Sequence, residues 1–86
     1  MPKYNKGRFI FSAPSKRKNK KYDVYDKQNK YITSFGDKRY EQYKDKIGYY
    51  SHKDHNDKKR RDNYYSRHGK TATPLSARYF SHKYLW

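Results

Sequence analysis

The sequence contains no cysteine and no long run of apolar residues. Without thiols it cannot form a disulfide framework or a thiolate metal site, and the lack of cysteine fits a reducing compartment. No segment approaches the roughly 20 apolar residues that a membrane-spanning helix needs. The N-terminus also lacks the apolar stretch, roughly 7–15 residues long, of a secretory signal peptide. We therefore expect neither a membrane span nor a secretory leader.

Acidic residues are scarce as well: eight Asp and Glu stand against 23 Lys and Arg, which gives a formal net charge of +15. An excess of this size is far larger than solubility requires. It favours partners that carry negative charge, such as nucleic-acid phosphates, anionic membranes or acidic protein surfaces. The charge alone does not separate these partners.

Apolar residues make up only 31% of the 86 residues, and 12 residues are tyrosine, whose hydroxyl needs a partner when the ring is buried. So small a core contributes only a few kcal/mol to stability. We therefore expect one small domain at most. Its stability is expected to depend on a partner, which can be nucleic acid, another subunit or an assembly into which the protein is built.

The first part of the chain, residues 1–21, contains eight Lys and Arg residues and no acidic residue. Two prolines and a glycine break any helix, so this segment is predicted to be an extended basic arm. Phe9, Ile10 and Phe11 interrupt the arm with a short apolar patch that has little nearby to bury against. We predict that the patch docks on a partner; a local hydrophobic cluster is the alternative.

The remaining segment, residues 22–86, is predicted to be a small α+β domain. Residues 22–35, YDVYDKQNKYITSF, contain two β-rich stretches around a DKQNK turn, which is typical of a β-hairpin. A lone hairpin is only marginally stable in water, so other elements must cover it.

Three short helices are predicted to follow the hairpin and to supply that cover. Each begins at a residue suited to N-capping; these residues are Asp37, then Asn56 or Asp57, then Thr73. The first helix is predicted to end just before Gly48, the second at His68 and the third at about Lys83. In the first helix, Tyr40, Tyr43 and Ile47 share one face, and this spacing favours core packing over base stacking. Trp86 is predicted to be buried against the hairpin or a neighbour.

The second predicted helix carries its cations at an unfavourable end. Four consecutive cations crowd its first turns, where the helix dipole prefers anions. A phosphate or a partner carboxylate would relieve this conflict, although a solvated face with salt bridges to nearby acids is the alternative. The residues predicted to bind nucleic acid or an acidic partner are Lys16, Arg17, Lys18, Lys20, Lys21, Lys58, Lys59, Arg60, Arg61, Arg67 and Lys70.

Catalytic and metal sites find little support. His52, His55 and His68, with nearby carboxylates, are possible zinc ligands by residue type. Such clusters in polar connectors are more often capping residues, so no metal or other cofactor is expected. A His-Asn-His nuclease site fails because Asn63 and His68 are too close in sequence for its supporting helix. No phosphate loop, nucleophile elbow or redox pair is present. Neither enzyme activity nor a small-molecule substrate is expected.

Three fragments resemble a family of small basic proteins of unknown function from large double-stranded DNA viruses of algae and protists. The fragments are FGDKRYEQYKDKIG, HKDHNDKKRRDNYYSRH and TATPLSARYFSHKYLW. In that family a hairpin leads into an FG-x-x-x-Y segment, a Tyr-rich link, an H-x-D-x-x-(K/R)-(K/R) helix that ends in Arg-His, and an aromatic C-terminus with Leu-Trp. The resemblance covers about residues 22–86. It implies a viral protein packaged in the virion, and it supplies no catalytic residues.

Two functions are therefore predicted, both located in the virion. The first is a non-enzymatic minor capsid or cement protein that bridges larger capsid or virion proteins through the basic arm, the tyrosine-rich surfaces, Phe9–Phe11 and Trp86. The second is a packaged protein that binds DNA or RNA without reading sequence and condenses the genome. The two can overlap, because an inner-capsid protein can face the genome.

Overall fold

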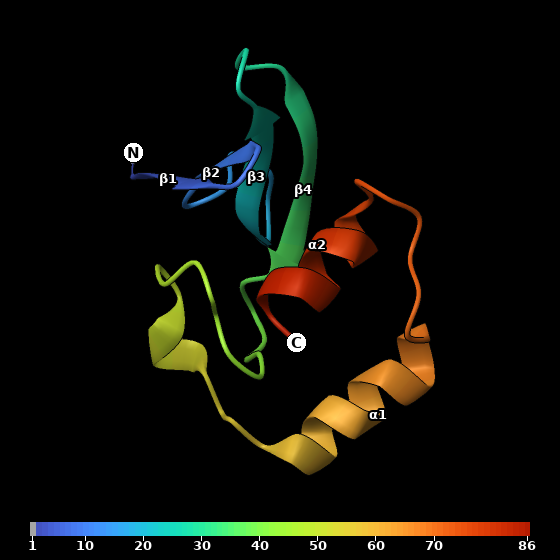
Figure 1. The fold of residues 1–86 in the computed structure, drawn as a ribbon. Coiled ribbons are helices and arrows are strands. Elements are labelled where there is room, and N and C mark those ends of the chain that lie inside the picture. The colour runs from blue at the N-terminus through green and yellow to red at the C-terminus, as the bar shows by residue number, and fades with distance from the viewer. Residues whose placement is uncertain (1) are drawn as a thin grey trace.

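A computed structural model describes residues 2–86, which form a four-stranded antiparallel sheet and two α-helices (Figure 1). The strands lie in the sheet in their chain order: β1 (Lys3–Lys6), β2 (Phe9–Ser12), β3 (Lys20–Asp26) and β4 (Tyr31–Asp37). A 3-10 turn (Ser51–Lys53) precedes α1 (Lys58–His68) and α2 (Ala77–Tyr84). The predicted α+β class is confirmed. Within residues 2–86, neither helix combines the length and apolar character needed to cross a bilayer.

The extended basic arm is not confirmed, because the described part of residues 1–21 contains both β1 and β2. Phe11 lies opposite Tyr4 of β1 and Val24 of β3, so β2 is an inner strand of the sheet. Phe9 is 6% exposed and Phe11 fully buried in the chain's own core. Their predicted docking on a partner is therefore wrong. The lysines of β1 make this segment look like a solvated basic arm in the sequence. Edge strands often carry Lys because its charge discourages pairing with further strands.

The hairpin predicted over residues 22–35 is confirmed and forms β3 and β4. Tyr22 and Val24 point to one face and are fully buried. The turn is closed by Asp26, whose Oδ1 accepts hydrogen bonds from the backbone N–H groups of Gln28 and Lys30, both at 2.9 Å. An Asp that bonds to its own turn in this way is a common local signal.

The hydrophobic core lies between one face of the sheet and α2, which packs against β4 (Figure 1). Phe11 is at its centre, with ring centroids 5.9 Å from Phe35, 6.0 Å from Phe80 and 4.8 Å from Tyr84. Edge-on aromatic pairs of this kind add about 0.5–1.5 kcal/mol each beyond the area they bury. Aromatic rings thus compensate for the low aliphatic content.

The helix predicted over residues 37–48 is wrong: residues 38–57 form a loop with one 3-10 turn. Asp45 holds this loop. Its Oδ1 accepts from the N–H groups of Ile47 at 2.9 Å and Gly48 at 3.0 Å, and its Oδ2 accepts from Tyr50 N at 2.8 Å and from the Tyr22 hydroxyl. An Asp side chain that binds nearby N–H groups competes with helix formation.

Gln42 anchors the other part of the loop and is fully buried. Its Oε1 accepts a hydrogen bond from Lys21 Nζ, and its Nε2 donates to Tyr50 O at 2.9 Å and Asp54 Oδ1 at 2.6 Å. Burial of the Lys21 ammonium, together with nearby Lys53, lowers the pKa of Lys21 to about 8. A buried polar network therefore replaces the apolar stripe that the sequence predicts.

The second predicted helix is confirmed as α1. Its N-cap is Asp57, whose Oδ1 accepts from Lys59 N at 2.9 Å and Arg60 N at 3.3 Å, and Gly69 follows its last residue. These are the capping residues that the sequence indicates.

The third predicted helix exists but begins later than expected. Its N-cap is Ser76 rather than Thr73, and α2 starts at Ala77. Leu75 has a φ of 65°, in the left-handed region, so a right-handed helix cannot run through it from Pro74.

Candidate nucleic-acid interface

The basic helix α1 lies apart from the sheet (Figure 1), and Tyr64 is the only buried residue among the 11 that form it. The Tyr64 ring stacks on Trp86, with centroids 4.4 Å apart and planes 5° from parallel. Its hydroxyl also lies 3.0 Å from Nδ1 of His82, and burial raises the pKa of Tyr64 to about 12. Trp86 is half-buried between α1 and the edge of the hydrophobic core. This aromatic stack is the main buried contact of α1.

Two of the predicted binding residues help to tether α1. Arg61 Nε donates to Trp86 O at 2.7 Å, and its guanidinium lies 5.1 Å from the ring centroid of Tyr43. Arg60 forms a salt bridge of 2.8 Å to Glu41, with both side chains about half exposed. Exposed pairs of this kind contribute little to stability. Arg60 and Arg61 are thus partly engaged within the chain.

The remaining cations of this region are free to bind a partner. Within residues 2–86 their side chains make no hydrogen bond or salt bridge, and all are exposed; they are Lys58, Lys59, Arg67 and Lys70. The first turn of α1 contains no acidic residue. The conflict between the cations and the helix dipole is offset by the Asp57 cap and by the Arg60–Glu41 pair, which leaves Lys58 and Lys59 without acidic partners at the N-terminal end of α1.

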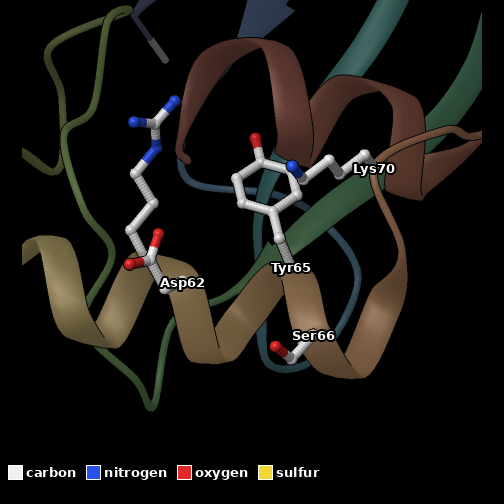
Figure 2. Close-up of a pocket in the computed structure, with 5 residues that line it drawn as sticks. Asp62, Tyr65, Ser66 and Lys70 are labelled. Carbon is white, nitrogen blue, oxygen red and sulfur yellow. The ribbon is translucent and has the colours of Figure 1, made fainter.

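A cleft of about 560 Å³ lies beside α1 and is lined by Arg61, Asp62, Tyr65, Ser66 and Lys70. Figure 2 shows the Tyr65 ring directed from α1 toward α2, with the Lys70 side chain extending toward it. The Tyr65 hydroxyl donates to His82 O at 3.3 Å, which fixes the ring. Cations, hydroxyls and an aromatic ring are groups that contact phosphate, sugar and base.

Few carboxylates of the chain form ion pairs with its cations. Within residues 2–86 only two salt bridges form, Arg39–Asp37 and Arg60–Glu41. Five other carboxylates accept hydrogen bonds from backbone N–H groups or uncharged side chains; they are Asp23, Asp26, Asp45, Asp54 and Asp57. All but two of the 23 Lys and Arg side chains therefore lack a side-chain carboxylate partner. Most of the acids therefore hold the fold without forming ion pairs, and the chain keeps a net charge of +15 after they are counted.

A second group of predicted binding residues lies in and beside the β2–β3 loop. Lys16, Arg17, Lys18 and Lys20 are exposed there, as a binding role requires. Lys21 is only 1% exposed and bonded to Gln42, so its predicted role in binding a partner is wrong. The contacts of this loop are with β3 and β4, not with α1.

The histidines are placed by aromatic packing. Within residues 2–86 no three His, Asp or Glu side chains gather as a metal site would require. His52 is exposed, whereas His55 lies 5.3 Å from the Trp86 ring and His68 lies 4.6 Å from the Tyr64 ring. Burial, reinforced by nearby Arg60, lowers the pKa of His55.

His82 and the cleft residue Ser66 are features that the sequence did not indicate. The Nδ1 atom of His82 is hydrogen-bonded to the Tyr64 hydroxyl, and the backbone carbonyl oxygen of His82 accepts a hydrogen bond from the Tyr65 hydroxyl. Burial lowers the pKa of the His82 ring. The only sequence signal is the aromatic face of the C-terminal helix, which does not tell which element will lie against it.

No protein-family model, curated protein or solved structure matches this chain. The resemblance to the viral family therefore stays a prediction. A function can therefore be inferred only from the charge distribution and geometry of the molecule.

Proposed function

We propose that this protein binds nucleic acid through the phosphates, without reading base sequence. The observation that carries the proposal is that, within residues 2–86, all but two of the 23 Lys and Arg side chains lack a side-chain carboxylate partner. Cations that neutralise phosphates release condensed counterions, and this release supplies most of the free energy of sequence-independent binding. A chain whose acids are used to hold the fold is well suited to that role.

The side chains of α1 form the main proposed contact surface. Asp57 already accepts from the N–H groups of Lys59 and Arg60, so phosphates would be held by side chains and not by the end of the helix. Lys58, Lys59 and Arg67 project without partners, and the cleft adds Lys70 and the Tyr65 ring. Flexible lysines suit phosphate contacts that carry no sequence information.

The viral resemblance favours a particular setting for this activity. In that setting the protein is non-enzymatic, is packaged in the particle of a large DNA virus and condenses the genome. The net charge of +15 is appropriate for neutralising a packed polyanion.

The test is a salt titration of the purified full chain with a fluorescent mixed-sequence DNA, followed by anisotropy. If about 6–10 phosphates are contacted, affinity is expected to fall by about 10³–10⁵ between 50 and 200 mM salt. A second oligonucleotide of unrelated sequence should bind equally well. Absence of salt-sensitive binding at 50 mM to either DNA or RNA would reject the proposal.

A second candidate function is a minor capsid or cement component that bridges larger virion proteins. It is favoured by exposed tyrosines outside the basic helix: Tyr40 at 65%, Tyr31 at 44% and Tyr49 at 37% exposure. Tyrosine is enriched at protein interfaces, where one end of the ring is apolar and the other wet. A fixed copy number per particle and retention after genome removal would support this function, and release together with the genome would contradict it.

A further inference from the structure

The sheet has a second face, opposite the one that α2 covers. Its central feature is a row of side chains that crosses all four strands. Asn5 pairs with Ile10, Ile10 with Tyr25 and Tyr25 with Tyr31, so these four residues lie side by side. The register shift after Val24 brings Tyr31 into the row, and the two tyrosine rings lie 5.8 Å apart.

The row is accessible, in contrast to its neighbour on the same face. Tyr31 is 44% exposed, and Ile10 and Tyr25 are half-buried. In the next row Asp23 is 2% exposed, because the β2–β3 loop closes over it and Lys16 N donates to its Oδ2 at 2.9 Å. A groove of about 290 Å³ remains, lined by Lys3, Ile10, Ser12, Lys16, Tyr25 and Asn29.

The edges of this face are positive. The Arg17 guanidinium lies 5.4 Å from the ring centroid of Tyr31, and Lys27 Nζ donates to Asn5 Oδ1 at 3.1 Å. Lys3 and Lys16 line the groove itself. The buried carboxylate of Asp23 accepts hydrogen bonds from the β2–β3 loop and β4, and its one negative charge offsets only part of the charge of these four cations.

We propose that this face binds single-stranded nucleic acid, with bases stacked on Tyr25 and Tyr31 and phosphates held by the surrounding cations. The inference rests on the proposed function and adds to it a preference for unpaired strands. Bases in a duplex are stacked inside the helix, whereas those of a single strand can stack on exposed aromatic rings and guanidinium planes. The Arg17–Tyr31 pair offers both kinds of surface.

The experiment compares the binding of a mixed-sequence single strand with that of the duplex of the same sequence. The double variant Tyr25→Leu/Tyr31→Leu removes both rings without changing charge, and Tyr25→Phe/Tyr31→Phe keeps the rings. Tyr40→Leu is the matched control, because Tyr40 is exposed and has Arg39 over its ring at 5.7 Å but lies outside the sheet.

The leucine pair is expected to weaken single-strand binding at least about tenfold. Its duplex affinity and its dependence on salt should match those of the wild type, because the cations are unchanged. The phenylalanine pair and Tyr40→Leu should bind both probes normally. In the wild-type protein, ring proton shifts of Tyr25 and Tyr31 should move with the single strand and not with the duplex, which tests the inference even if the leucine pair fails to fold.

Four outcomes would overturn the inference. Single-strand affinity of a folded leucine pair could equal that of the wild type, or the tyrosine shifts could stay fixed; the phosphate-binding proposal would then survive alone. Equal competition by polyglutamate, which has charge but no bases, would show that the face attracts any anion. Failure of the wild type to bind either probe in a salt-sensitive way would reject both proposals.

Discussion

The sheet core and α1 belong to the same small chain but are held in different ways. Where the sheet meets α2, Phe11, Tyr22, Phe35 and Phe80 are fully buried, whereas α1 buries only Tyr64. Local stability follows the density of buried contacts, so α1 is expected to open more easily than the sheet. The few apolar residues are thus concentrated in the core between the sheet and α2, and most side chains of α1 are left exposed and charged.

The largest effect is expected from emptying the centre of the core. Phe11→Ala removes a fully buried ring that contacts both the sheet and α2, and should lower the free energy of unfolding by about 3–5 kcal/mol. Thermal denaturation followed by circular dichroism would measure it. Tyr40→Ala is the control, since an exposed residue should change stability by less than about 0.5 kcal/mol. Equal melting of the two variants would contradict the proposed core.

A smaller loss is expected from the loop that joins the two regions. Gln42→Leu leaves the buried Lys21 ammonium without its acceptor, which should cost about 1–3 kcal/mol or somewhat more because the group is charged. Gln28→Leu, in the exposed β3–β4 turn, is the matched control. Urea denaturation measures both. If Gln42→Leu left stability unchanged, the polar network would not be what holds residues 38–57.

A third substitution is expected to weaken the attachment of α1 without affecting the sheet core. Trp86→Ala removes the ring that stacks on Tyr64, a contact of about 0.5–1.5 kcal/mol beyond its buried area. Amide hydrogen exchange in residues 58–68 should accelerate while that of β3 stays slow. Faster exchange in both regions would show that they unfold together.

The smallest effect is a pH dependence of α1 docking. Burial lowers the pKa of both His55 and His82. The unfolded state, with ordinary histidine pKa values near about 6.5, then binds more protons, so docking loses stability as pH falls below that value. Protection factors of the α1 amides, which correct for the slower intrinsic exchange at low pH, should decrease between pH 7.5 and 5.5, and less so in His55→Gln/His82→Gln. Larger protection factors at low pH would contradict the assignment.

Elements with local signals could be predicted from the sequence. The β3–β4 turn carries its own Asp26 bonds, and α1 carries its caps at Asp57 and Gly69. The loop conformation of residues 38–48 could not be predicted, because the spacing of their tyrosines fits a helix. Gln42 binds Lys21, which is far away in sequence, so no local pattern reveals the competing network.

The candidate site was predicted in part, for a similar reason. Lys58 and Lys59 are exposed on a basic helix, as its charge order indicated. Lys21 resembled its basic neighbours, and only the tertiary fold shows that it is buried. Phe9 and Phe11 were predicted to dock on a partner because the lysine-containing segment before them was not recognised as a strand. That segment, β1, pairs with β2 and lets both rings enter the core.

The most direct test of the central claim, that α1 presents unneutralised cations to phosphate, is the salt dependence of duplex binding in two charge-matched variants. Lys58→Gln/Lys59→Gln removes two free cations of α1, and Lys38→Gln/Lys44→Gln removes two exposed cations of the preceding loop. The α1 variant should reduce the slope of log K against log salt by about 0.9 for each phosphate that is no longer neutralised, while the loop variant keeps the wild-type slope. Equal slopes in the two variants would contradict the account.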